Sequence, residues 1–322
     1  MTTAARASDI SVVMATYNRA QLVARALRSV SRQTDMPGEI VVVDDASTDG
    51  TPDVVRAWAK EASVPVRLLV AESNRGAGAA RNSGIAAASG EFVAILDSDD
   101  EYLPHALASL SAPLREDRGA VVSFADAEVV FADGRPPHRH VAQHLSPEKG
   151  VSPTDVPGLY RLDDPQAHLL TTSFIPTCAA LFRRDAALRV GCMPEARFGE
   201  DWLFWLRLTE QGDFLCRFED VAIVHRQADN LTGGANDLAN ARRVLDALRE
   251  VREGRHIALG AGQEQRLDAE IAKQEQAWRY FASRAGLAAY WDALGREGDR
   301  LAQLRRDPRS LLRAVAATLR RG

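Results

Sequence analysis

The sequence has little cysteine and no long hydrophobic run, and both absences exclude classes of protein. Its three cysteines, Cys178, Cys192 and Cys216, are an odd number without CxxC spacing. They argue against a disulfide framework or a zinc site and fit a reducing compartment. Residues 1–9 lack the apolar core of a signal peptide, and no stretch of about eighteen apolar residues occurs. We expect a cytoplasmic protein, with any membrane contact peripheral to the inner face of the membrane.

The chain also lacks a strong excess of either charge. Its 322 residues carry a net charge of -4, with 26% charged and 46% hydrophobic residues. This composition is ordinary for a soluble globular protein and gives no reason to expect a nucleic-acid partner. The length suits one large domain with an appendage, or two domains.

Short apolar runs alternate with amphipathic stretches over the first hundred residues. The pattern predicts strands at 10–15, 39–43, 66–70 and 91–96, and helices at 21–33, 51–62 and 76–88. This alternation predicts parallel strands joined by right-handed crossovers, with helices on both faces of the sheet. Ligands bind such sheets outside the carboxyl ends of the strands.

The fourth of these strands ends in three carboxylates, Asp97, Asp99 and Asp100. Folding gives no reason for them, because neighbouring acids repel one another and lose hydration on burial. While the chain stays extended, Asp97 and Asp99 project to the same side, roughly 7 Å apart, and suit a hard divalent cation. The alternative is a polar turn that caps the next helix, with Asp100 at the helix start and Pro104 in the first turn.

Polar residues also follow the first and second strands, as Thr16 with Tyr17 and Asp44 with Asp45. A folding requirement explains one such cluster, but it does not explain three clusters on one rim of a sheet. The loop at 74–78 lacks GxGxxG spacing and follows the third strand, so we disfavour a dinucleotide-binding site.

The pattern changes after residue 120. We expect strands at 120–124, 127–131, 177–182 and 221–226, helices at 184–190 and 199–208, and a long irregular loop at 134–165. After residue 236 the sequence predicts only helices, at 237–253, 263–284, 287–304 and 308–319.

The last 27 residues, from Arg296, contain eight arginines and three acidic residues. They form either the solvated face of a helical bundle, which we favour, or a basic amphipathic surface for anionic lipid. Contact between two copies of the chain through these helices also stays open. The apolar side chains of this segment are Leu301, Leu304, Leu311, Leu312, Val315 and Leu319.

The motifs at the strand ends closely resemble those of family 2 glycosyltransferases of the GT-A fold. The matching segments lie between residues 9 and about 230, and in order they are 11–18, 43–51, 74–84, 96–100 and 199–201. The resemblance implies an α/β GT-A domain over 1–236, with a mixed sheet flanked by helices. Its donor half would span about 9–110 and its acceptor half about 111–236. It does not cover the C-terminal helical region, 237–322.

The resemblance implies transfer of a sugar from a nucleotide-diphosphate-sugar donor to an acceptor hydroxyl, usually with inversion at the anomeric carbon. It also implies a role in cell-surface polysaccharide biosynthesis. UDP is the commonest donor nucleotide in similar enzymes, and the acceptor would be a glycan, a lipid-linked molecule or a natural product. A nucleotidyltransferase is disfavoured, because no glycine-rich phosphate loop with a lysine follows the first strand. A non-catalytic sugar-nucleotide-binding protein is the other alternative, although all the expected carboxylates are present.

Several residues are similar to the family's donor-binding positions. Tyr17 offers an aromatic face to the nucleobase, and Asp45 can accept a hydrogen bond from a base N–H, while Asp44 orients the loop. Asp97 is similar to the residue that contacts ribose, and Arg81 either contacts the donor or pairs with nearby carboxylates. The remaining donor positions are Ala15, Thr16, Asn18, Asn74, Gly76 and Ser98.

The resemblance also implies a divalent cation, Mn²⁺ or Mg²⁺, held by Asp99 and acting as a Lewis acid on the leaving diphosphate. His225 stands where similar enzymes often carry a histidine near the metal, although a lone histidine is more often a structural residue. The spacing of His138, His140 and His144 also allows metal binding, but no firm scaffold supports it.

Asp201 matches the general base of the family, which removes the proton of the acceptor hydroxyl. At the start of a helix the macrodipole stabilises its negative charge. The alternative is that Glu200 and Asp201 are an ordinary acidic first turn. Trp202 and Trp205 are candidates for an acceptor platform, although large aromatic residues on a helix are more often part of the core.

Overall fold

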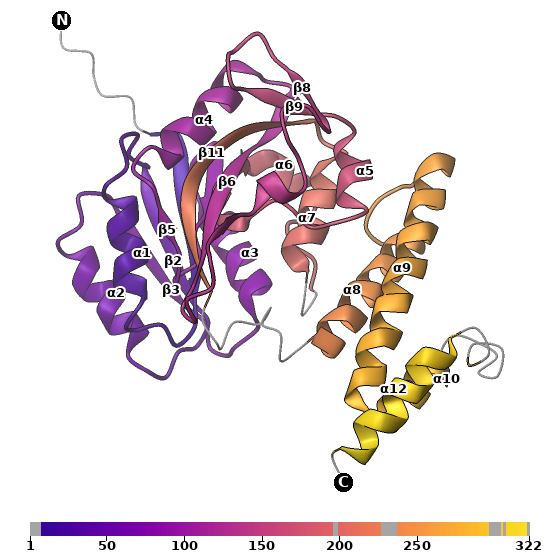
Figure 1. Cartoon of the computed structure of the whole chain (residues 1–322). Coiled ribbons are helices and arrows are strands. Elements are labelled where there is room, and N and C mark those ends of the chain that lie inside the picture. The colour runs from indigo at the N-terminus through magenta and orange to yellow at the C-terminus, as the bar shows by residue number, and fades with distance from the viewer. Residues whose placement is uncertain (1–7, 196–198, 227–236, 296–303, 305–306, 321–322) are drawn as a thin grey trace, which may run out of the picture. The chain divides into compact units, whose positions relative to one another are not determined.

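The computed structural model describes residues 8–195, 199–226, 237–295, 304 and 307–320 of the chain (Figure 1). The chain divides into two compact units, 1–228 and 229–322. The predicted boundary at 236 lies outside the described residues.

The first unit is built on one mixed sheet of eleven strands. Parallel strands form one side of it, in the order β3 (Val66–Val70), β2 (Glu39–Asp44), β1 (Ile10–Thr16) and β4 (Phe92–Ile95). The antiparallel strand β10 (Ala180–Arg183) joins β4 to β6 (Ala120–Phe131), which runs parallel to β11 (Asp213–Arg226). The sheet continues through β9 (Tyr160–Leu162) to β8 (Val151–Pro153), and β5 (Glu101–Tyr102) and β7 (His138–Arg139) pair with β11 and β6. The expectation of a mixed sheet is confirmed.

Helices pack on both faces of the sheet because β1 is apolar on both sides. Ile10, Val12 and Met14 point into the core with α1 (Val23–Val30) and α4 (Ala106–Glu116). Val13 points to the other face, toward α3 (Ala77–Ala87), where a side chain on Gly84 would lie 2.3 Å from Val13 Cγ1. Glycine is therefore required there for helix and strand to pack so closely. The other helices of this unit are α2 (Thr51–Ala59), α5 (Pro165–Leu169), α6 (Arg184–Arg189) and α7 (Glu200–Leu208), with 3₁₀ turns η1 (Val141–Gln143) and η2 (Thr177–Ala179).

The predicted break between strands 120–124 and 127–131 is wrong, because β6 is continuous. Asp126 interrupts the apolar pattern but is fully buried, and its carboxylate accepts the N–H groups of Val141 and Ala142 at 2.7 and 2.9 Å. A buried carboxylate with backbone donors is satisfied and does not end a strand. Its partners belong to the segment 134–165, which was expected to be irregular but contains β7, η1, β8 and β9.

Several further boundaries differ from the prediction. The strand expected at 177–182 begins only at Ala180, after η2. Strand β11 begins at Asp213, eight residues before the expected start at 221, because it pairs along β6 through register shifts between Cys216 and Ala222. Such bulges break the side-chain alternation that sequence patterns rely on. The segment after Asp100 forms β5, and α4 begins only at Ala106, so Asp100 does not start a helix.

The second unit is helical in its described part, as predicted. It contains α8 (Asp237–Arg252), α9 (Ala261–Ala285), α10 (Leu287–Gly295) and α12 (Pro308–Leu319). The helix expected at 287–304 is described as far as Gly295, and residues 296–303 lie outside the described part. The helices pack around two apolar clusters, one with Leu245 and Trp278 and one with Tyr290 and Ala314. Among the described helices, none combines the length and the apolar character that crossing a membrane requires.

Candidate active site

Polar side chains gather at the carboxyl ends of β1, β2 and β4. Thr16 and Asp44 are neighbours in the register of β1 with β2, and both are buried. Within the described part of the chain, neither Thr16 Oγ1 nor Asp44 Oδ1 has a hydrogen-bond partner. The next residue, Tyr17, is 45% exposed, which is unusual for a large aromatic side chain beside a sheet core. Ala15 precedes this pair at the end of β1.

Loops after the strands are held by the carboxylates and the amide that the sequence singled out. Asp45 accepts the N–H groups of Arg75 and Gly76 at 2.9 and 2.8 Å, so it fixes the loop that contains the exposed Asn74. Asn18 accepts the N–H of Thr48 at 2.8 Å. Asp44 accepts the N–H of Ser47 at 2.9 Å and so holds the loop after β2, as expected. Asp45 braces a second loop, and its carboxylate keeps acceptor capacity beyond these bonds.

The acidic segment after β4 forms a turn. The N–H of Asp100 donates to the carbonyl oxygen of Asp97 at 3.0 Å, and Ser98 lies buried between them. The expectation that Asp97 and Asp99 project from an extended strand is therefore wrong, because β4 ends at Ile95. A turn separates the directions of consecutive carboxylates, which lets each find a different partner.

The side chains of this turn leave it in three directions. Asp97 Oδ1 lies 2.6 Å from Arg81 Nη2, and Asp99 Oδ2 lies 3.7 Å from Arg19 Nε. Asp100 Oδ1 accepts the backbone N–H of His225 at 2.9 Å, which joins the turn to the end of β11. The His225 ring turns to Glu101, with 2.9 Å between Nε2 and Oε1.

Burial and mutual repulsion disfavour the negative charge of the acidic turn, even with Arg19 and Arg81 beside it. Burial and the charge of Asp97 raise the pKa of Asp99. Burial, Asp97 and Asp99 together raise the pKa of Asp100 to about 8. A bound cation would relieve this repulsion, and carboxylate oxygens are the donors that Mn²⁺ and Mg²⁺ prefer. The described residues hold no group of three or more His, Cys, Asp or Glu side chains arranged for a metal, so a cation here would need ligands from a substrate or water.

Arg81 connects the acidic turn to a second acidic pair, more than a hundred residues later in the chain. Its side chain is only 8% exposed and bonds Asp97 at 2.6 Å and Glu200 at 3.1 Å. Burial opposes its charge, but Asp97 and Glu200 raise the pKa of the guanidinium. Burial and the charge of Asp201 raise the pKa of Glu200. Arg81 therefore pairs with carboxylates, one of the two roles that the sequence left open.

Asp201 lies in the first turn of α7, after Gly199, whose φ of 74° suits glycine. Its Oδ2 accepts the hydroxyl hydrogen of Thr177 at 3.1 Å. Thr177 belongs to η2, just before β10, so this bond orients the carboxylate from the sheet. Close approach of α3 to this helix start requires a second glycine, since a Cβ on Gly78 would lie 2.9 Å from Glu200 Cγ.

Some expected residues lie elsewhere. Trp202 and Trp205 are buried, and Trp202 Nε1 donates to the carbonyl oxygen of Leu169 at 2.6 Å, so both tryptophans belong to the core. His140 and His144 lie with their ring centroids 6.3 Å apart, and burial lowers the pKa of His140 to about 4. His144 also packs against Phe174, with 6.3 Å between their ring centroids.

Sequence reasoning missed Thr177 and did not include Glu200 in the site. Thr177 contacts Asp201 across 24 residues, and no local pattern marks a threonine that bonds so far along the chain. Glu200 carried a signal, because it stands next to Asp201, but its pairing with Arg81 depends on how α3 and α7 pack.

Comparisons with known proteins support one family. The chain is 41% identical over 130 residues to the succinoglycan biosynthesis protein ExoO of Rhizobium meliloti (strain 1021), covering 39% of this chain and 35% of that protein. It is 38% identical over 245 residues to the uncharacterized glycosyltransferase YwdF of Bacillus subtilis (strain 168), covering 75% of this chain and 83% of that protein. Matches to ExoO and to an uncharacterized glycosyltransferase of Nostoc sp. span only 35% and 30% of those proteins.

Solved structures show the same fold. TarS 1–349 of S. aureus in complex with UDP-GlcNAc aligns with a TM-score of 0.63 and 20% identity, over 89% of this chain and 79% of that chain. A mannosyltransferase of Pyrobaculum calidifontis in complex with GDP-Man and Mn²⁺ aligns with a TM-score of 0.60 and 20% identity, over 94% of this chain and 80% of that chain. The predicted GT-A fold is confirmed.

A model of one protein family matches the part of the chain that contains the acidic turn. The model described as glycosyl transferase family 2 matches residues 11–191, which include β1, β2, α3, β4 and the acidic turn. With that match and the similarity to YwdF over most of both proteins, we conclude that the chain belongs to glycosyl transferase family 2.

Proposed function

We propose that this protein transfers a sugar from a nucleotide-diphosphate-sugar to an acceptor hydroxyl, with inversion at the anomeric carbon. One observation carries the proposal. Buried Arg81 bonds both Asp97, in the acidic turn, and Glu200, beside Asp201, so the two carboxylate groups needed for donor binding and for proton removal lie at one rim. Family membership supports this reaction class.

The donor nucleotide would lie over the ends of β1 and β2. Tyr17 has the exposed ring on which a base can stack, and buried Asp45 holds the neighbouring loop while retaining acceptor capacity for a base N–H. We propose UDP as the nucleotide, with GDP as the next candidate. Around it we place Asp97 at the ribose, held by Arg81, together with Ala15, Thr16, Asn18, Asn74, Gly76 and Ser98.

A divalent cation fits the acidic turn, where burial and the neighbouring charge of Asp97 raise the pKa of Asp99. We propose Asp99 as its main protein ligand. His225 remains a candidate, but its Nε2 would first have to leave Glu101, which lies 2.9 Å away. When bound, the cation would neutralise charge on the leaving nucleotide diphosphate.

Asp201 is the proposed general base. Its surroundings differ from those of the neighbouring acid, Glu200. Glu200 is occupied by Arg81, whereas Asp201 accepts one hydrogen bond from Thr177 and stands at the positive end of α7. Asp201 would take the proton of the acceptor hydroxyl as that oxygen attacks the anomeric carbon from the face opposite the diphosphate. Thr177 would hold the carboxylate in the orientation that this transfer needs.

The names of two relatives suggest an acceptor class. The chain is similar to a succinoglycan biosynthesis protein and, at 28% identity over 203 residues, to a putative teichuronic acid biosynthesis glycosyltransferase. We propose a growing cell-surface polysaccharide as acceptor, with lipid-linked and natural-product acceptors as alternatives.

The test starts with donor binding and separates it from chemistry. A thermal-shift panel of UDP-, GDP- and dTDP-sugars, with and without Mn²⁺, identifies the nucleotide, because a ligand of the native state raises the melting temperature. In Asp201→Asn we expect transfer, or slow hydrolysis of the donor, to fall by about 10³-fold while the thermal shift persists.

Three outcomes would redirect the proposal. Donor binding without turnover in the unaltered protein would indicate a non-catalytic binder. Release of pyrophosphate on incubation with a nucleoside triphosphate and a sugar 1-phosphate would indicate a nucleotidyltransferase. Full activity in Asp201→Asn would remove Asp201 from the mechanism.

A further inference from the structure

The last described helix, α12, carries its larger apolar side chains on the outside. Leu312, Val315 and Leu319 are 69%, 39% and 77% exposed, and their spacing of three and four residues places them on one stripe of the helix. The buried side of α12 is formed by the small residues Ser310 and Ala314, which lie about half a turn from Leu312. A helix on the surface of a soluble bundle normally shows the reverse arrangement.

The inner side of α12 packs against other helices of the second unit. Ala314 packs in the cluster with Tyr290 and Leu294, against which Leu304 and Leu311 also pack. Thr318 Oγ1 accepts the N–H of Leu287 at the start of α10 at 2.8 Å. The expected apolar face is therefore divided. Leu304 and Leu311 pack in the bundle, whereas Leu312, Val315 and Leu319 are exposed to solvent. Leu301 is not among the described residues.

Positive charge accompanies the exposed stripe. Arg309 on α12 and Arg320 at its C-cap are exposed and lie on the same flank of the stripe, about a quarter turn from its centre. The segment from Arg296 onward has eight arginines against three acidic residues, an excess of five positive charges in a chain whose net charge is -4. Arginine beside exposed leucine is the composition of helices that lie in the interface of an anionic bilayer.

From this stripe and its charge we infer that α12 docks on the surface of an anionic membrane, with Leu312, Val315 and Leu319 inserted among the lipids. The helix lies parallel to the surface, since none of the described helices can cross a bilayer. A second copy of the chain is the less suitable occupant, because a symmetric contact would bring two arginine-rich segments together. The inference does not depend on the proposed transferase activity.

Vesicle flotation of the whole protein tests this inference. We expect binding to vesicles of phosphatidylglycerol and phosphatidylcholine, little binding to phosphatidylcholine alone, and weakening at high salt. The double variant Leu312→Ser/Leu319→Ser should reduce the binding constant at least about tenfold, since each leucine loses its burial in lipid. Arg309→Gln should reduce it about fivefold on the anionic vesicles only.

The matched control is Leu188→Ser, which removes an exposed leucine, 42% exposed, from α6 of the first unit. It should bind vesicles like the unaltered protein. Circular dichroism of the double variant should be unchanged, because its two leucines make no part of the described apolar clusters.

Three results would overturn the inference. They are no binding to either vesicle, equal binding by the double variant, and a concentration-dependent dimer that the double variant abolishes. The last of these would assign the stripe to a second copy of the chain.

Discussion

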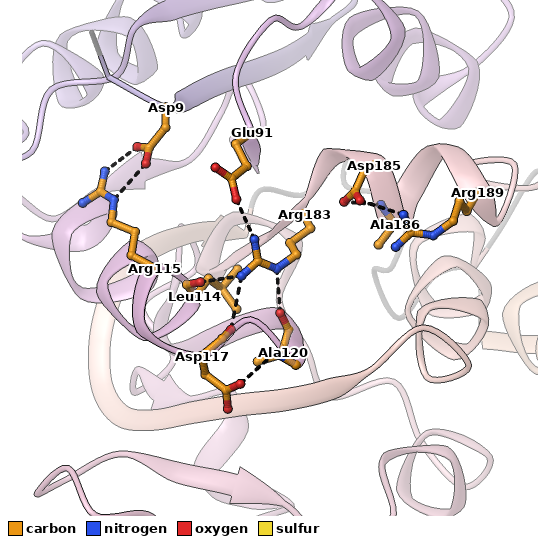
Figure 2. A network of polar contacts seen from close by, with 11 residues as sticks. Asp9, Glu91, Leu114, Arg115, Asp117, Ala120, Arg183, Asp185, Ala186 and Arg189 are labelled. Carbon is orange, nitrogen blue, oxygen red and sulfur yellow. Dashed lines mark hydrogen bonds and ion pairs between the residues drawn. The ribbon is translucent and has the colours of Figure 1, made fainter. Parts of the chain in front are cut away.

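At the amino ends of the central strands, acidic side chains lie beside arginines (Figure 2), whereas at the carboxyl ends several of them lie beside one another. Figure 2 shows Arg183 bonding Glu91 and the carbonyl oxygens of Leu114 and Ala120, and Arg115 pairing with Asp9. Each of these two arginines thus binds groups that lie close to the ends of strands and helices.

The electrostatic consequence differs between the two ends. At the amino end, burial opposes ionisation of Glu39, but hydrogen bonds from Ser89 and Ser11 lower its pKa below the ordinary value. At the carboxyl end, burial and neighbouring acids raise the pKa of Asp99, Asp100 and Glu200. Hydrogen bonds keep Glu39 ionised at the amino end, whereas at the carboxyl end Arg19 and Arg81 do not offset burial and mutual repulsion of the acids, which favours a ligand that brings positive charge or a proton.

The largest effect should come from Arg81, the one described cation buried between two carboxylates of the rim. Arg81→Met leaves Asp97 and Glu200 without their partner, and we expect a loss of about 3 kcal/mol in the free energy of unfolding. Arg115→Met at the amino end, where the side chain is 36% exposed, should cost about 1 kcal/mol. Urea unfolding of both variants measures the difference, and equal losses would contradict the contrast between the two ends.

A smaller effect, on rate alone, should follow from Thr177→Val. Loss of its hydrogen bond to Asp201 should lower kcat about tenfold and leave the KM for donor unchanged, because in our proposal Thr177 orients the general base and does not bind nucleotide. Thr177→Ser keeps the hydroxyl and should restore most of the rate. A rise in donor KM, or equal loss in the serine variant, would assign Thr177 a packing role.

Asp99→Asn should stabilise the metal-free protein while abolishing its response to metal. The substitution removes a charge that burial and repulsion by Asp97 disfavour, both of which raise the pKa of Asp99, and we expect the melting temperature to rise by about 2 °C. The shift caused by nucleotide with Mn²⁺ should disappear. Glu39→Gln, the matching change at the amino end, should lower the melting temperature instead.

The smallest effect should be the acid sensitivity of the amino end. The pKa of Glu39 is lower in the folded than in the unfolded chain, so its contribution is fully present above the unfolded value of 4.5. That contribution disappears as pH falls through the folded pKa, and we expect it to be about 1 kcal/mol or less. Urea unfolding between about pH 3 and 6 should show this slope in the unaltered protein and a shallower slope in Glu39→Gln.

The sheet rim was predictable because the repeating pattern is local. Apolar runs of four to seven residues predicted the bounds of β1, β2, β3 and β4 nearly to the residue. The rule that parallel strands end at one edge of a sheet predicted that Tyr17, Asp45 and Asp97 lie on the same rim. The prediction failed at Asp126, where a polar residue lies inside a continuous strand. Its compensation comes from Val141 and Ala142, which no local window includes.

The geometry within the rim was not predictable for the same reason. An extended Asp97–Asp99 pair is the simplest interpretation of that spacing, but hydrogen bonding after β4 turns the chain. Arg81 was equally compatible with a donor contact until α7 brought Glu200 beside it. In α12, periodicity identified the apolar side chains, but only the packing of α10 and α12 showed which of them are covered.

By itself, the sequence determined the alternation of strands and helices, the rim on which the polar motifs meet, and the family to which those motifs belong. These properties depend on residues close together in the chain, where side-chain periodicity and turn chemistry act. The tertiary structure alone decided which charges are paired, which carboxylate of the Glu200–Asp201 pair bonds Arg81, and which face of α12 stays uncovered. Electrostatic and packing energies depend on distance in space, and folding sets those distances between residues that the sequence keeps far apart.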